Sequence, residues 1–167
     1  VMIMVIGTFM YDAVDNMLEL QFDLLQRESV TINFFGPVSS DVELEIAKEK
    51  AVLFTEGYRL VPIRIRSGSL SKEILLQGIP KNAELRRLIG EGEKILVPPD
   101  TGILLNSQVA QKLSISVGQE IQLEILEGNR KKVNVVVEGI VTEILGQGAY
   151  MERRAVNKLL GESESFN

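Results

Sequence analysis

The stretch "GILLNSQVAQKLSISVGQEIQLEILEGNRKKVNVVVEGIV", residues 102–141, is the most regular part of the chain and decides the fold. Its first half predicts a short helix, because Val109, Ala110 and Leu113 recur at three- and four-residue steps and would share one buried face. Asn106 or Ser107 stands where an N-cap is expected, since both side chains can accept a hydrogen bond from a free backbone N–H.

The second half of the same stretch predicts a β-hairpin. Ile121, Leu123 and Ile125 alternate with polar residues, as in a strand that buries one face. Gly118 permits a tight turn before this strand, and the pair Gly128-Asn129 is a turn signal after it. The valine-rich residues 131–141 would then return as the second strand.

A second hairpin is predicted over residues 61–79, around Ser67-Gly68-Ser69. Val61, Ile63 and Ile65 alternate with polar or proline residues and would face a core. Arg64 and Arg66 fall on the other face, which is either a solvated strand surface or a candidate docking face for an acidic partner.

Further elements are predicted from β-branched runs, capping residues and glycines. They are a strand at 29–36, a helix at 39–50 capped by Ser39 or Ser40 with Lys48 and Lys50 in its last turn, a short helix at 82–89, a strand at 95–98, a helix at 153–160 ended by Gly161, and a polar connector at 162–167.

The N-terminal region predicts a helix over 8–27 that runs back into residues 1–7 without a cap or a proline. Its apolar stripe includes Met17, Leu20 and Leu24, and the first ten residues carry no charge. Another face carries four carboxylates, which are either a solvated face or a cation site: Asp12, Asp15, Glu19 and Asp23.

Composition narrows the functional classes. The chain has 167 residues, 45% of them hydrophobic and 25% charged, which suits one domain or two small lobes. Its net charge of −5 argues against nucleic-acid binding, which favours a basic surplus. The absence of Cys and His excludes zinc sites of the thiolate or imidazole type and histidine general bases.

No catalytic motif emerges from the sequence. The segments "GEGEK" (90–94) and "GQGAY" (146–150) lack the surrounding residues of a phosphate-binding loop and are interpreted as turns. Carboxylates are plentiful, but nothing marks an acid–base pair. We therefore expect a non-catalytic domain with no cofactor and no metal.

The order of these pieces resembles the extracytoplasmic domain of FtsX-like and MacB-like ABC-transporter permeases. The resemblance lies in "GILLNSQVAQKLSISVGQEIQLEI" followed by "VNVVVEGIV", in "ILLQGIP" (74–80), and in "TFMYDAVDNMLELQFDLLQRESVTINF" (8–34) as the exit from a transmembrane helix. It covers nearly the whole chain, although its motifs are structural glycines and apolar alternation. Gln119 stands where the family often has Asp.

The resemblance implies an α+β fold with two lobes and a long N-terminal helix leaving the membrane. Residues 1–27 would be the end of a transmembrane helix continuing as a membrane-proximal helix, 28–80 a porter-like α/β lobe, 81–150 a β-rich sabre-like lobe, and 151–167 a short helix and connector, after which relatives continue. The membrane-proximal apolar residues would be Met2, Ile3, Met4, Ile6, Phe9 and Met10.

The function implied is to relay ATP-driven motion, through a coupling helix that includes Met17, Leu20 and Leu24, to export of a substrate or to control of a partner. The partners implied are a cytoplasmic ABC ATPase subunit, a second permease in a membrane dimer, and an extracytoplasmic substrate or partner protein. The domain would lie in the periplasm or outside the cell.

A second resemblance leaves an alternative open. "KLSISVGQEIQLEI" (112–125) is also similar to the turn of small cytosolic β-barrels, such as substrate-recognition domains of AAA ATPases or swapped-hairpin transcription factors. Residues 102–145 would then form a binding module with no membrane link. This alternative leaves the uncharged opening residues unexplained.

Overall fold

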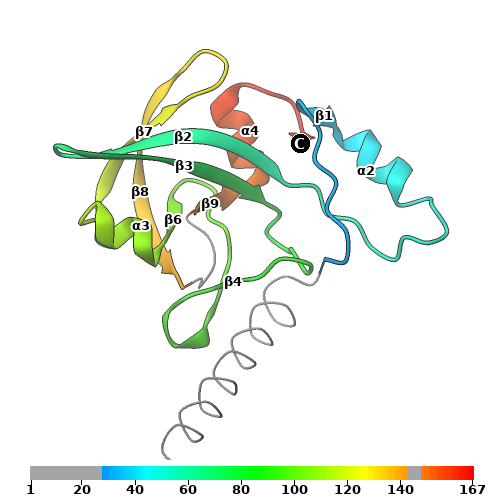
Figure 1. Cartoon of the computed structure of the whole chain (residues 1–167), viewed down its shortest axis with the longest axis horizontal. Coiled ribbons are helices and arrows are strands. Elements are labelled where there is room, and N and C mark those ends of the chain that lie inside the picture. The colour runs from blue at the N-terminus through cyan, green and yellow to red at the C-terminus, as the bar shows by residue number, and fades with distance from the viewer. Residues whose placement is uncertain (1–27, 143–147) are drawn as a thin grey trace, which may run out of the picture.

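The computed structural model describes residues 28–142 and 148–167. Six strands form a closed barrel in the order β2-β3-β9-β6-β8-β7 (Figure 1). They are β2 (Arg59–Ser67), β3 (Leu70–Ile79), β6 (Ile103–Asn106), β7 (Glu120–Ile125), β8 (Lys132–Val141) and β9 (Gly148–Glu152). The pairs β3–β9 and β6–β8 are parallel, and the other neighbouring pairs are antiparallel.

Both predicted hairpins are confirmed. β2 and β3 pair along their whole length up to Ser67 and Leu70, and Gly68 in the turn has a φ of 57°. β7 and β8 pair from Glu120 opposite Val136 to Glu124 opposite Lys132. A left-handed glycine, Gly128 with a φ of 55°, lies in their connection, where a side chain would be strained.

The interior of the barrel follows the alternation that the sequence predicts. Inward side chains at every second position of each strand form one apolar core, to which the helices α3 (Ser107–Lys112) and α4 (Arg153–Leu160) contribute. The strand residues buried there are Val61, Ile63, Ile65, Ile74, Leu76, Ile103, Leu105, Ile121, Leu123, Ile125, Val135, Val137, Ala149 and Met151.

β6 and β9 are buried on both faces. Their outward residues Leu104 and Tyr150 belong to a second cluster, which is covered by the small ribbon of β4 (Leu88–Ile89) and β5 (Ile95–Leu96). This double burial explains the continuous apolar run Ile103–Leu105 in β6. The predicted turn "GQGAY" is wrong at Gly148–Tyr150, which begin β9.

The helices predicted from capping residues are confirmed. α3 (Ser107–Lys112) begins at Asn106, whose side chain accepts a hydrogen bond of 2.9 Å from the Gln108 N–H. α4 (Arg153–Leu160) ends at Gly161, which has a φ of 75°. Figure 1 shows α3 towards the tip of the β2–β3 hairpin and α4 towards its open end.

The segment 28–57 departs from the prediction. No strand forms at 29–36, where Val30, Ile32 and Phe35 are exposed, because no described strand lies beside them to complete a ladder. The helix predicted at 39–50 is α2 (Ser40–Ile46), which Ser39 caps. It ends before Lys48 and Lys50, so neither lies in its last turn.

Two further predictions are wrong. Residues 82–89 form turns and β4 rather than a helix, and β4 pairs with β5 inside the predicted strand 95–98. Between them lies the short 3₁₀ segment η2 (Glu91–Glu93). Residues 162–167 are not a free connector, because β10 (Ser165–Phe166) pairs with β1 (Val38–Ser39) and is buried.

The fold is therefore mixed α/β with a sheet-rich body, in line with the predicted fold class at that level. The division into lobes at residue 80 does not appear, because β2 and β3 close the same barrel as β6–β9. The long N-terminal helix and the boundary at residue 27 lie outside the described residues.

Candidate functional site

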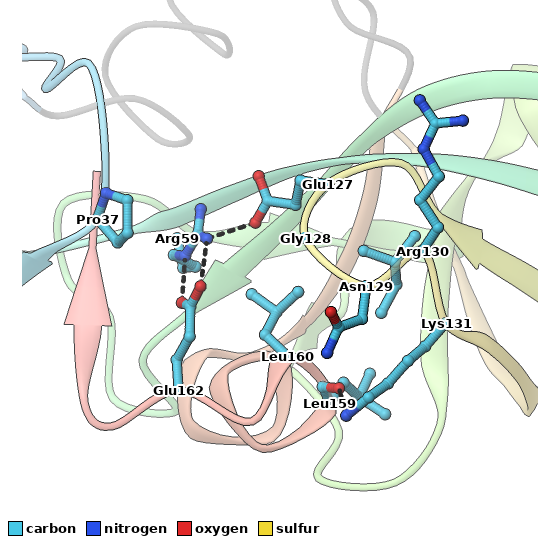
Figure 2. Close-up of a pocket in the computed structure, with 11 residues that line it drawn as sticks. Pro37, Arg59, Glu127, Gly128, Asn129, Arg130, Lys131, Leu159, Leu160 and Glu162 are labelled. Atoms are coloured by element: carbon cyan, nitrogen blue, oxygen red, sulfur yellow. Dashed lines mark hydrogen bonds and ion pairs between the residues drawn. The ribbon is translucent and has the colours of Figure 1, made fainter.

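A cavity of about 260 Å³ lies between the β7–β8 turn and the C-terminal end of α4 (Figure 2). Its apolar wall comes from Pro37, Ile125, Leu159 and Leu160. Its polar lining comes from Arg59, Glu127, Gly128, Asn129, Arg130, Lys131 and Glu162. Segments far apart in the sequence thus meet in one concave surface.

The centre of the polar wall is Arg59, whose relative exposure is only 1%. Its Nε and Nη2 donate to the two carboxylate oxygens of Glu162, at 3.1 and 3.2 Å, and Nη2 also donates to Glu127. Nη1 donates to the Leu60 carbonyl at 2.9 Å. The buried guanidinium is therefore satisfied by charge-assisted hydrogen bonds, as a buried cation requires.

The two carboxylates remain accessible from the cavity. The side chains of Glu127 and Glu162 are 30% and 32% exposed, against 2% for Arg59. Together the three groups carry one negative charge in excess.

The two basic residues of the β7–β8 turn do not pair with Glu127 or Glu162. Lys131 Nζ donates to the Leu159 carbonyl at 3.4 Å, at the C-terminal end of α4, where a cation is favourable. The Arg130 guanidinium points away from Glu127 and Glu162 in Figure 2.

Sequence reasoning missed this site. Arg59 lies two residues before Val61 and therefore on the same face of the strand as Val61, Ile63 and Ile65. Starting the predicted hairpin at residue 59 instead of 61 would place it on the inward face. Its partners lie 68 and 103 residues away, and no local pattern links them to it.

Arg64 and Arg66, the candidate partner face, lie on the outward face of β2 and are already paired. Arg64 contacts Glu73 on β3 at 2.5 Å and Glu124 on β7 at 3.0 Å, and Arg66 contacts Glu124 at 3.1 Å. Hydrogen bonds from Arg66 and then Arg64 lower the pKa of Glu124. The partner face remains a prediction, and an acidic partner would compete with Glu73 and Glu124.

The other predicted site residues lie outside the described residues. They are the membrane-proximal Met2, Ile3, Met4, Ile6, Phe9 and Met10, the coupling residues Met17, Leu20 and Leu24, and the carboxylates Asp12, Asp15, Glu19 and Asp23. Within residues 28–142 and 148–167, no cluster of three or more acidic residues is arranged to hold a metal ion. No helix in that part of the chain is long and apolar enough to cross a bilayer.

The fold resembles that of two solved structures, both of which are extracytoplasmic domains of ABC transporters. One solved structure with this fold is the extracellular domain of the noncanonic ABC-type transporter YknZ from Gram-positive bacteria, with a TM-score of 0.56 and 14% identity over 78% of this chain and 70% of that one. Another is the periplasmic region of MacB from Actinobacillus actinomycetemcomitans, with a TM-score of 0.51 and 12% identity over 84% of this chain.

The chain covers 65% of the length of the MacB region. No family model matches the sequence, and no curated protein matches it. At these identities the likeness concerns the fold.

Proposed function

We propose that this chain is an extracytoplasmic, non-catalytic domain of an ABC-transporter permease of the MacB-like and FtsX-like kind. The observation that carries the proposal is the fold shared with the YknZ and MacB domains over most of the chain. The order of sequence pieces that resemble this family supports it independently of the fold.

In this proposal the domain relays motion that originates in ATP hydrolysis by a cytoplasmic ABC ATPase subunit. The permease would act as a dimer in the membrane, and the domain would lie in the periplasm or outside the cell. The relayed motion would serve export of a substrate or control of an extracytoplasmic partner protein.

The proposed coupling element is the N-terminal region. Its sequence predicts one helix over 1–27, which at about 1.5 Å per residue would span roughly 40 Å. Met2, Ile3, Met4, Ile6, Phe9 and Met10 would form its membrane-proximal end. Its apolar residues Met17, Leu20 and Leu24 would pack against the domain. A stiff helix transmits displacement that a flexible linker would absorb.

The test is a Gly-Pro-Gly insertion between Asn16 and Met17 in the full-length permease. ATP hydrolysis by the partner should persist and the domain should still fold, while export or partner activation falls sharply. A matched control is the same insertion between Glu49 and Lys50, an exposed turn beyond α2. Wild-type activity with the first insertion would show that rigid coupling through this helix is wrong.

One observation favours the alternative of a cytosolic barrel module. The six strands do close into a small barrel that contains residues 103–141. The reading frame of the parent protein separates the two proposals. Apolar spans of about 20 residues on both sides support the permease, and their absence supports the cytosolic module.

A further inference from the structure

We propose that residues 30–34 form a docking edge for a second copy of this chain. The same residues of the two copies would pair as antiparallel strands, with Ile32 of one copy opposite Ile32 of the other at a twofold axis. The inference concerns association of the chain with itself, so it does not depend on the function proposed above.

The docking edge has the side chains of a strand but no neighbouring strand. Its β-branched and aromatic residues favour a strand, as the sequence predicts. Within residues 28–142 and 148–167, no backbone hydrogen bond joins residues 30–34 to another segment. The side chains of Val30 and Ile32 are 78% and 56% exposed. The neighbour that would complete the strand is therefore to be sought outside this part of the chain.

The docking edge is already held in position on one side. The ring of Phe34 packs edge-on against the buried ring of Phe166, with 6.0 Å between the ring centroids. A few residues further on, β1 pairs with β10. Figure 1 shows the segment as a trace that leads directly into β1. A segment that is anchored in this way loses less conformational entropy when a partner binds.

The charge pattern favours a partner strand that is itself uncharged. Residues 29–40 contain no Asp, Glu, Lys or Arg and are the longest such run in the chain, although 25% of all residues are charged. Edge strands of native proteins commonly carry a lysine or another charge that blocks pairing with a further chain. Two copies of this segment would meet without repulsion between like charges across the strands.

The order of the side chains is complementary to itself. In an antiparallel pair centred on Ile32, Val30 lies opposite Phe34 and Thr31 lies opposite Asn33. One face of the pair is then entirely apolar, and the other carries hydroxyl and amide groups that can bond across the strands. Pairs of an aromatic and a β-branched residue are among the favourable cross-strand pairs. This match identifies a second copy as the partner.

The first measurement is sedimentation equilibrium of the wild-type chain over a range of protein concentrations. We expect a reversible equilibrium of monomer and dimer, and the dimer should dissociate on dilution because the interface is small. Ile32→Lys should abolish the dimer, since it places two ammonium groups directly opposite each other. Ile32 is exposed, so the circular dichroism spectrum of the variant should match that of the wild type.

Two control variants carry the same change at other exposed apolar positions. Val136→Lys lies on the outer face of β8, where the side chain is 45% exposed, and Leu53→Lys lies beyond α2, where it is fully exposed. Both should dimerise like the wild type. A dimer that Leu53→Lys abolishes and Ile32→Lys leaves intact would place the contact elsewhere and overturn the proposal.

Cysteine cross-linking tests the register, because the chain has no native cysteine. Under mild oxidation, Ile32→Cys should form a disulfide-linked dimer. Directly opposite Cβ atoms are about 4.5–5.5 Å apart, and a disulfide requires about 3.5–4.5 Å, so a small adjustment suffices. Thr31→Cys and Asn33→Cys should cross-link more when mixed than when either is oxidised alone. Val136→Cys measures the background of random collisions.

The wild-type sedimentation decides the matter even where a variant fails to fold. A chain that stays monomeric at the highest soluble concentration would overturn the proposal and leave the docking edge to a strand from another protein. Equal cross-linking of Thr31→Cys and Asn33→Cys alone and in mixture would overturn the proposed register and with it the twofold pairing.

Discussion

The buried Arg59 connects the C-terminal segment of the chain to the barrel. It lies at the start of β2, and its ion pairs reach the β7–β8 connection through Glu127 and the segment after α4 through Glu162. The neighbouring Leu60 extends this link, because its backbone N–H donates to the Asn167 side chain at 2.7 Å. A single buried cation thus fixes three distant segments.

Replacing Arg59 with Met should destabilise the fold by about 3 kcal/mol, because two carboxylates lose their buried counter-charge. Both carboxylates are about a third exposed, so water offsets part of the loss and keeps the value at the low end of the range for buried pairs. The measurement is urea unfolding followed by circular dichroism.

Arg154→Met is the matched control for this substitution. Arg154 pairs with Glu164, but the two side chains are 74% and 51% exposed. Its loss should cost less than about 1 kcal/mol, as is usual for surface pairs. Similar losses for the two variants would contradict the role assigned to burial.

The pH dependence of stability should be steep on the alkaline side because of Tyr58. Burial and then the hydrogen bond to Glu56, at 2.6 Å, raise the pKa of this phenol far above its ordinary value near 10. The native state therefore keeps the proton while the unfolded chain loses it. Tyr58 stabilises the fold below about pH 10, and this contribution is lost as the pH rises further.

We expect the urea midpoint of the wild type to fall more between about pH 9 and pH 11 than that of Tyr58→Phe, which has no proton to lose. The comparison of the two slopes removes the effects of lysine titration, which both proteins share. Parallel slopes would show that Tyr58 ionises normally in the folded chain.

Single residues were predictable where local rules govern them. Asn106 as a cap and Gly161 as a helix terminator follow from hydrogen bonding and left-handed geometry within a few residues. Arg59 was not predictable, because its burial depends on carboxylates that reach it only after the barrel closes.

At the scale of elements, Gly57 marks the junction of α2, α4 and β10. Its N–H donates to Glu43 at 3.1 Å, its carbonyl accepts from Arg153 at 2.8 Å, and Arg153 also contacts Glu43 at 3.1 Å. A side-chain carbon at this position would lie 2.8 Å from the Phe166 ring. The absence of a side chain lets these elements meet.

Gly57→Ala should therefore displace Phe166 and destabilise the chain by about 1–3 kcal/mol, the usual cost of overpacking. Gly36→Ala is the control, because no atom lies within 4 Å of the added carbon and its φ is not left-handed. That variant should be neutral or slightly stabilising. Equal urea midpoints for the two variants would contradict the close packing described here.

Elements were predictable where one continuous segment contained both the apolar alternation and the turn signal. Both hairpins have alternation and a turn signal within a few residues of each other. The strand predicted at 29–36 failed because β propensity needs a neighbouring strand, and none lies there among the described residues. β5 lies inside the strand predicted at 95–98, whereas β4 was missed within the helix predicted at 82–89, because it has only two residues.

At the scale of the whole molecule, closure of the barrel joins residues on both sides of position 80. Arg64 of β2 lies opposite Glu124 of β7, and Leu76 of β3 lies opposite Ala149 of β9. The apolar interior is shared by all six strands. We expect the barrel to unfold as one cooperative unit.

Native-state hydrogen exchange tests this expectation. The slowest amides of β2 and β3 should exchange with the same free energy of opening as those of β7 and β8, and with the same denaturant dependence. Two different free energies of opening, one for amides before residue 80 and one for amides after it, would instead support two lobes.

The closed barrel itself was beyond prediction from the sequence, since its decisive pairings are non-local. β2 meets β7 and β3 meets β9 through main-chain hydrogen bonds that any residue except proline can make. The sequence does show which alternate residues of each strand face the core, and this limits the register once two strands pair.

The order of the strands has a consequence for the chain during its synthesis. β9 is the last barrel strand to leave the ribosome, yet it lies between β3 and β6. Until residues 148–152 emerge, both of those earlier strands keep one edge without its native neighbour. Exposed strand edges invite pairing with other chains. The nascent protein is therefore most prone to aggregate just before β9 is added.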